Sequence, residues 1–330
     1  MKNLTSDLVP RCVGRYLIDL PREFGVNPVA RAQVEDVTVI VEPMERTKFD
    51  QRLRERTESL RMEKIFGEET ASLADIHPLP DNQGSVFNRS KSRDVASHRT
   101  LELHGWKNGY AVQMESNAFD RGLDKQVPEW DTRQTNIAER LAHLLSLYSR
   151  TSGRADHEIP TGPGVCVRHG FIQGPATDQE WIELNYYLST AEDVSFTFRY
   201  LSHIGPMSDT LLQRGGAIEP ALAKVNGRTL RKGVRDAHPL KPEEWLMERE
   251  IDPGVKDYHF TLEINSKQGN AHAPLLVIDL DSGSRIPRTE GTLEEAAKVK
   301  PIAKATLGEA ESIALWDAVI PTLRARPGAF

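Results

Sequence analysis

One short segment of the chain occurs twice, and this repeat constrains the fold more than any other feature. The segments Arg11–Ile18 (RCVGRYLI) and Gly164–Ile172 (GVCVRHGFI) both place a cysteine among alternating apolar and polar residues. A period of two is typical of a β-strand with one buried face. The cysteines are the only two in the 330 residues and lie 154 positions apart (166 − 12). The spacing predicts two related lobes, each beginning with a cysteine-containing strand.

The length supports two domains of about 150 residues each. A breaker-rich segment around residues 151–160 separates the halves, so we place the lobes at residues 1–155 and 156–330. We expect Cys12 and Cys166 to be buried and unbonded in separate cores, because a free cysteine packs as a small hydrophobe. A Cys12–Cys166 disulfide is the alternative, and two cysteines alone do not identify the compartment.

Hydrophobic periodicity predicts a similar series of strands and helices in each half. We expect strands at 34–41, 85–91, 97–103, 110–115, 181–188, 194–200, 257–264 and 275–280. Helices are expected at 45–66, 131–150, 208–225 and 309–324, with Asp131 as a cap and a short helix after Pro242. Asn108-Gly109 between two strands indicates a hairpin. The predicted class is α+β, with two pseudo-repeat lobes, each a mostly antiparallel sheet with flanking helices, forming a cleft.

Composition and motifs exclude several classes of function. A net charge of −6 argues against a nucleic-acid partner. The sequence contains no run of about 18 apolar residues, the length that a membrane-spanning helix needs. The chain has no Gly-x-Ser-x-Gly elbow, phosphate loop, dinucleotide fingerprint or paired zinc-ligand motif. We therefore predict no catalytic residue, metal site or cofactor, although a triad built from distant residues stays open because triads are recognised by geometry.

Partner contacts are expected on polar loops, because strands and helices are occupied with packing. The candidate loops are residues 81–93, 117–130 and 226–235. The second loop offers Phe119 and Trp130 as apolar anchors. The third belongs to a run, 224–235, with five cations and no acid, and its arginines suit bidentate pairing with carboxylates. These arginines are Arg228, Arg231 and Arg235; a solvated basic loop is the alternative.

The opening segment CVGRYLIDLP (Cys12–Pro21) resembles the N-terminal domain of type VI secretion lipase-immunity proteins, the class cognate to the fourth family of phospholipase effectors. The second half resembles the C-terminal domain of that family. The matching segments are Cys166 with 170–172, then YHFTLE at 258–263, PLLVIDL at 274–280, and the ending 314–328. The match covers most of the chain, and the order of the segments is more specific than any one of them.

The resemblance implies a non-enzymatic inhibitor that binds a cognate secreted phospholipase and protects the cell from self or sibling intoxication. Inhibition would come from holding the lipase cap shut or covering its active-site mouth. The resemblance also implies a periplasmic location, although the residues before Pro10 lack the apolar core of a secretory signal, so a cytoplasmic protein or a mature exported form is expected. Two alternatives stay open: an envelope hydrolase or lipid-binding enzyme with a non-contiguous active site, and a periplasmic scaffold.

Overall fold

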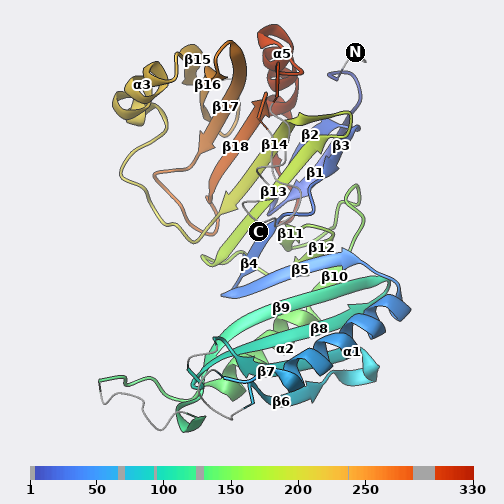
Figure 1. Ribbon diagram of the computed structural model, residues 1–330. Helices are drawn as coiled ribbons and strands as arrows, with labels where there is room; N and C mark the ends of the chain where they lie inside the picture. Colours follow the sequence, from blue (N-terminus) through green and yellow to red (C-terminus); the bar gives the residue numbers. More distant parts are fainter. Residues whose placement is uncertain (1–3, 66–70, 93–94, 124–129, 237, 285–301) are drawn as a thin grey trace. The chain divides into compact units, whose positions relative to one another are not determined.

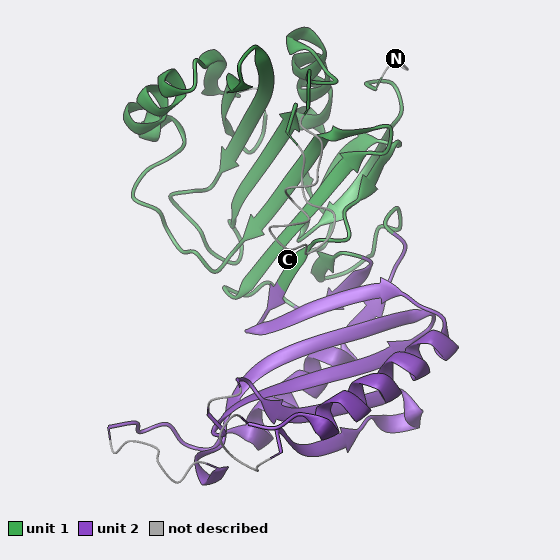
Figure 2. Ribbon diagram, in the orientation of Figure 1, with its two compact units in different colours: residues 1–32, 156–168, 175–330 green, residues 33–155, 169–174 purple. Residues whose placement is uncertain are grey.

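A computed structural model describes residues 4–65, 71–92, 95–123, 130–236, 238–284 and 302–330 (Figure 1). The chain forms two compact units (Figure 2). Unit 1 contains residues 1–32, 156–168 and 175–330, and unit 2 contains residues 33–155 and 169–174. The α+β class with mostly antiparallel sheets is confirmed. These units divide the chain differently from the predicted lobes 1–155 and 156–330. The division into those lobes and the cleft remain proposals.

Unit 2 is an antiparallel sheet with one helix on each face (Figure 1). Its strand order is β5 (Val37–Pro43), β9 (Tyr110–Phe119), β8 (His98–Lys107), β7 (Gly84–Ser90) and β6 (Leu73–Pro78). Helix α1 (Arg46–Met62) covers one face and α2 (Ile137–Ser149) the other. The smaller elements are β4 (Arg31–Val34), which pairs with β5, β10 (Thr151–Gly153), which pairs with β12 (Gly170–Gln173), and the 3-10 helices η1 (Pro80–Asn82) and η2 (Arg121–Leu123).

Local sequence signals account for most of unit 2. Val37, Val39 and Val41 alternate with exposed residues and are all buried, as their period of two predicts. Asn108 and Gly109 both have positive φ and close the β8–β9 hairpin, which confirms the predicted turn. The predicted helix 131–150 begins only at residue 137, because Asp131 bonds to a neighbouring arginine side chain and backbone amide and leaves the helix start uncapped.

The described residues of unit 1 form a larger antiparallel sheet, a small sheet contributed by both ends of the chain, and helices. The strand order of the larger sheet is β15 (Arg228–Val234), β16 (Glu243–Asp252), β17 (Val255–Ile264), β18 (Leu275–Ser282), β14 (Ala191–Leu201) and β13 (Glu180–Leu188), with β3 (Phe24–Val26) also paired to β13. The small sheet orders β1 (Leu8–Val13), β2 (Tyr16–Pro21) and β19 (Arg324–Ala325). The remaining elements are β11 (Gly164–Val167), α3 (Gly215–Lys224), α5 (Glu309–Val319), η3 (Leu212–Arg214) and η4 (Ile320–Thr322).

Two predictions in the second half of the chain are wrong. The segment after Pro242 is strand β16 rather than a short helix, since it pairs residue by residue with β17 and buries Trp245 completely. The segment 226–235 is mostly strand β15 rather than a loop. In both places cross-strand pairing overrides the local preference of the sequence.

The cysteines form a disulfide, with a Cα–Cα distance of 5.8 Å. The prediction of two unbonded cysteines in separate cores is therefore wrong. Both cysteines are fully buried, and both belong to unit 1 because residues 1–32 pack with the C-terminal half of the chain. The repeated motif thus marks two segments that meet, and it gives no support to a repeat of lobes.

Candidate partner-binding surfaces

The predicted contact residues lie in two different places. Arg228, Arg231 and Arg235 lie on or just after strand β15 in unit 1, whereas Phe119 and Trp130 belong to unit 2. The candidate loop 81–93 is largely strand β7. Residue 93 of that loop and residues 124–129 of the second candidate loop lie outside the described residues.

Two of the arginines form an internal ion-pair network. Arg231 donates from Nε to Glu244 at 2.7 Å and from both terminal nitrogens to Asp317 of helix α5 at 3.0 and 2.6 Å. Arg235 donates to the same two carboxylates at 2.9 and 3.0 Å. The Glu244 carboxylate, only 6% exposed, also accepts a hydrogen bond from Trp316 Nε1 at 2.9 Å. We call these five residues the arginine network.

The two arginines of the network favour the charged form of Asp317. Burial alone would raise the pKa of Asp317, but hydrogen bonds and charge from Arg231 and Arg235 outweigh it and lower that pKa. The pKa of Arg231 is raised by the same contacts against the opposing effect of burial. The basic run is therefore balanced by acids from β16 and α5, and it is not a free positive patch as its sequence indicated.

Arg228 is the most accessible of the three arginines, with 53% of its side chain exposed. It pairs with Glu248 at 3.2 Å and with Glu309 at 2.5 Å. Glu248 is also held by Lys256 at 2.8 Å, so it keeps a partner if Arg228 turns away. Arg228 is consequently the cation of β15 that an acidic partner can reach with the least internal disruption.

Trp130 is the most exposed large apolar side chain among the described residues, at 81%. Phe119 is buried at the end of β9, where the guanidinium of Arg133 lies 4.4 Å from the centre of its ring. Phe119 therefore supports the segment beside Trp130 rather than facing solvent. An exposed tryptophan on a supported segment is the type of residue that dominates binding energy in protein interfaces.

The residues after Trp130 are fixed by a dense set of hydrogen bonds. Asp131 accepts bonds from the Arg133 backbone N–H at 3.1 Å and from its side-chain Nε and Nη2 at 2.9 and 2.6 Å. These bonds from Arg133 lower the pKa of Asp131 to about 2. Arg121 donates to the Arg133 carbonyl at 3.2 Å. We call residues 130–136 the Trp130 segment; its fixed backbone reduces the entropy lost on binding.

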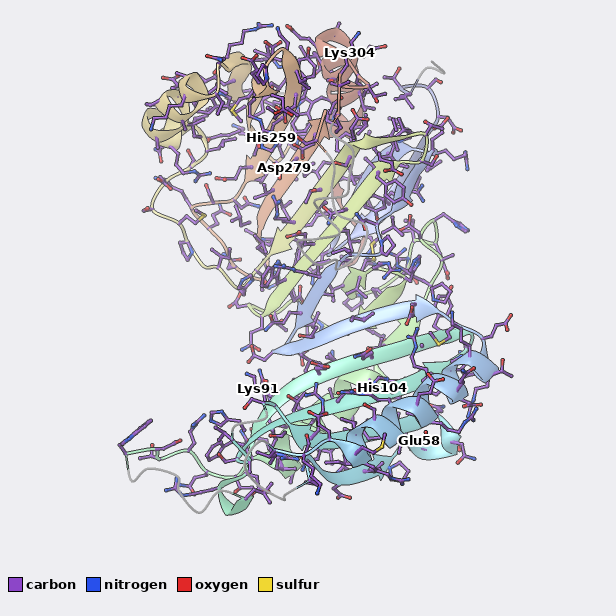
Figure 3. The ribbon with its side chains drawn as sticks, viewed as in Figure 1. Glu58, Lys91, His104, His259, Asp279 and Lys304 are labelled. Carbon is purple, nitrogen blue, oxygen red and sulfur yellow. A yellow bond between two sulfur atoms is a disulfide. The ribbon has the colours of Figure 1, made fainter. Side chains whose placement is uncertain are left out.

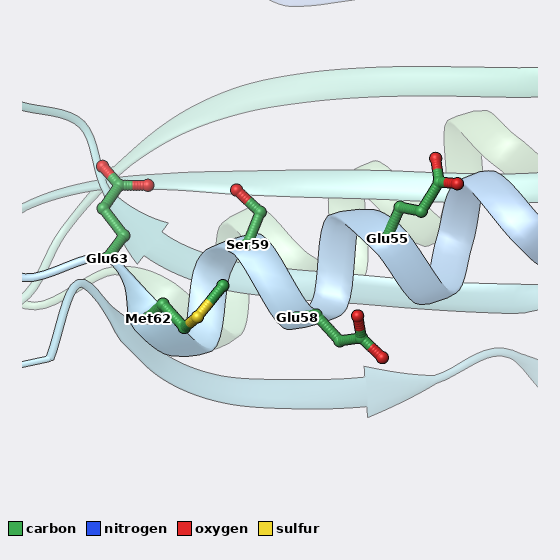
Figure 4. Close-up of a pocket in the computed structure, with 5 residues that line it drawn as sticks. All are labelled: Glu55, Glu58, Ser59, Met62 and Glu63. Atoms are coloured by element: carbon green, nitrogen blue, oxygen red, sulfur yellow. The ribbon is translucent and has the colours of Figure 1, made fainter.

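A groove of about 450 Å³ runs along the outer side of α1 (Figure 4). Its lining residues are Glu55, Glu58, Ser59, Met62 and Glu63, and Met62 is 77% exposed. Over the described part of the chain, no cluster of histidine, cysteine and acidic side chains has the arrangement of a metal site.

One arrangement in unit 1 resembles a catalytic triad in its distances. His259 Nδ1 lies 2.7 Å from Asp281 Oδ1, and its Nε2 lies 3.1 Å from the Thr261 hydroxyl. The hydroxyl donates instead to Asp279 Oδ1 at 2.9 Å, on the neighbouring strand (Figure 3). Burial opposes protonation of His259, but Asp281 and Asp279 outweigh it and raise the pKa. The hydroxyl already donates to a carboxylate instead of to the imidazole, so the arrangement lacks the base-activated nucleophile of a triad.

Two domain models of one protein family match the chain and together cover most of it. Residues 9–154 match the family model described as "Tle cognate immunity protein 4 N-terminal domain", and residues 158–328 match the corresponding C-terminal domain model. A search of curated proteins finds no match. No helix among the described residues has the length and apolar character needed to cross a membrane.

Solved structures share the fold over nearly the full length. The chain is 21% identical to a chain of the Tle4-Tli4 complex, with 100% of each chain covered and a TM-score of 0.74. It is 20% identical to the apo form of the T6SS immunity protein TplEi from Pseudomonas aeruginosa, with 98% of each covered and a TM-score of 0.70. TplEi complexed with the "L" peptide matches at 19% identity over 98% and 99%, with a TM-score of 0.68.

Proposed function

The chain belongs to the Tle cognate immunity protein 4 family, and we propose that it binds a secreted phospholipase effector and blocks its activity. The observation that carries this proposal is the match of both family domains, in order, over residues 9–328. The similarity in fold to a chain of the Tle4-Tli4 complex supports a protein partner of the same kind.

Inhibition would work by occupying a surface of the lipase. A lipase must open an apolar mouth, usually by moving a cap, before lipid enters. Trp130 provides an exposed, supported aromatic anchor, and Arg228 provides an accessible cation for a carboxylate on the partner. A complex that holds the cap closed or covers the mouth would need no chemistry from this chain. A cleft between the lobes 1–155 and 156–330 that grips the effector is part of the same proposal.

The protein is proposed to have no catalytic activity of its own. Among the described residues, the nearest approach to a triad lies around His259, where the Thr261 hydroxyl donates to Asp279 instead of to the imidazole. This geometry argues against the alternative of an envelope hydrolase with a non-contiguous site.

The proposed location is the periplasm. The Cys12–Cys166 disulfide supports it, because disulfides persist in oxidising compartments and are rare in the cytosol. Family membership supports it as well, since immunity is needed where a secreted effector acts.

The test is binding and inhibition with a phospholipase encoded beside this chain. We expect a stoichiometric complex and loss of phospholipid hydrolysis. Trp130→Ala should weaken binding by about 2 kcal/mol or more, about 30-fold in Kd. The control is Ile204→Ala, which removes another exposed apolar side chain outside the candidate surfaces. Undiminished hydrolysis with excess protein would refute the function, and equal affinity of the Trp130→Ala variant would remove the Trp130 segment from the interface.

A further inference from the structure

Three segments that are distant in sequence meet at the disulfide. Gly14 and Cys166 exchange two backbone hydrogen bonds, of 3.0 and 2.7 Å. The N–H of Gly164 donates to the carbonyl of Ala329 at 3.1 Å, and β19 near the C-terminus pairs with β2. We call residues 8–21, which form the β1–β2 hairpin, the N-terminal arm. The arm is therefore held by residues 164–167 and 324–329, both more than 140 positions away in the chain.

The arm is anchored by buried apolar side chains, among them Val13, Ile18 and Leu20, and by a buried ion pair. Arg15 and Glu180 are each 1% exposed and pair at 2.5 and 3.0 Å. Tyr200 donates to the same carboxylate at 2.7 Å, and Arg15 also donates to the carbonyl of Pro175 at 2.6 Å. Removing two charges from water offsets most of their attraction, so such a pair selects one geometry and adds little net stability.

The covalent link adds to these contacts by restricting the unfolded chain. In the unfolded chain, bringing Cys12 to Cys166 closes a loop of more than 150 residues, and the cross-link removes that cost in chain entropy from folding. A cross-link over a loop of this length changes the ratio of folded to unfolded molecules by roughly five-thousandfold in the chain-entropy model. Both sulfur-bearing residues are fully buried, so a reductant reaches them only when the arm opens.

We propose that the Cys12–Cys166 disulfide is a redox lock, which keeps the N-terminal arm docked only after the chain reaches an oxidising compartment. Two thiols each lose a proton and an electron as the S–S bond forms, and the electrons pass to the disulfide of a thiol oxidoreductase or of oxidised glutathione. A newly made chain in a reducing cytoplasm would keep the arm open and unit 1 incomplete. This regulation goes beyond the proposed function and is testable without an effector.

The experiment compares hydrogen exchange of the full chain in two states. One sample is oxidised; the other is unfolded, reduced and refolded with excess phosphine reductant. We expect protection of residues 8–21 to fall by about 100-fold or more in the reduced sample, given the effect of the cross-link on chain entropy. Strands β7, β8 and β9 of unit 2 should keep their protection and serve as the internal control. Refolding with oxidised glutathione should restore the arm.

Two outcomes would overturn the redox lock. Equal protection of residues 8–21 in both samples would show that the non-covalent contacts are sufficient. Loss of protection throughout, unit 2 included, would make the disulfide a requirement of the whole fold rather than a lock on the arm. The double variant Cys12→Ala, Cys166→Ala under oxidising conditions should reproduce the reduced pattern, which separates the missing bond from effects of the reductant.

Discussion

Removing both cations from the arginine network should destabilise unit 1 strongly. In the double variant Arg231→Ala, Arg235→Ala, the Glu244 carboxylate loses its bonds of 2.7 and 2.9 Å and keeps only the 2.9 Å bond from Trp316. Glu244 is 6% exposed, so water cannot replace the lost donors without opening the packing around α5. The variant therefore leaves a buried charge without a cation.

The size of the effect follows from burial. Removing one side of a buried ion pair typically costs about 3–5 kcal/mol. The contacts to Asp317 add about 1 kcal/mol at most, since Asp317 is 38% exposed and Arg231 37% exposed. We expect the free energy of unfolding of unit 1 to fall by about 3–5 kcal/mol, a large part of the 5–15 kcal/mol typical of a domain.

Urea unfolding at pH 7, followed by tryptophan fluorescence, measures this change. Lys224→Ala is the control, because it removes an exposed cation from α3 and should change stability by less than about 0.5 kcal/mol. Adding Glu244→Gln to the double variant should restore part of the loss, because a neutral amide is easier to bury than a carboxylate. The reasoning fails if the double variant unfolds at the same urea concentration as Lys224→Ala, or if Glu244→Gln restores nothing.

The pH dependence of the same variant checks the sign of the electrostatics. Asp317 has a lowered pKa in the folded state, so its contribution is present above its unfolded value of about 3.9 and is lost as the pH falls through the folded value. The wild-type advantage over the double variant should therefore shrink below about pH 4. An advantage that grows on acidification would contradict the assignment.

Two further variants test other parts of unit 1. Gly14→Ala should lower the free energy of unfolding by more than about 2 kcal/mol, because Gly14 has φ +58° and an added Cβ would overlap the ring of Tyr200. Thermal unfolding measures this loss, and an unchanged Tm would contradict the prediction. His259 has a pKa raised by Asp281, so its contribution is full below about pH 6.5 and is lost as the pH rises through the folded value. His259→Gln should consequently lose stability relative to wild type at pH 6 and approach it at pH 9, in paired urea titrations; an equal deficit at both pH values would count against it.

Local patterns were sufficient for several elements that bury one face. The alternation of Val37, Val39 and Val41 and the Asn108-Gly109 turn predicted their strands and hairpin correctly. The α+β class and the family resemblance followed from the order of such segments, and the matches to both family domains confirm that resemblance. These features depend on neighbours within a few residues, so the sequence by itself determines them.

Only the tertiary structure decided which distant groups meet. In the sequence, Cys12 and Cys166 belong to two similar segments that were assigned to separate cores. Pairing of the N-terminal arm with β11 and β19 brings the two cysteines together. The basic run 224–235 contains no acid, but Asp317 of α5, more than 80 positions away in the chain, pairs with its arginines. Periodicity reports that a side chain is buried and not what it is buried against; that partner is set by sheet order and chain closure, which no local pattern contains.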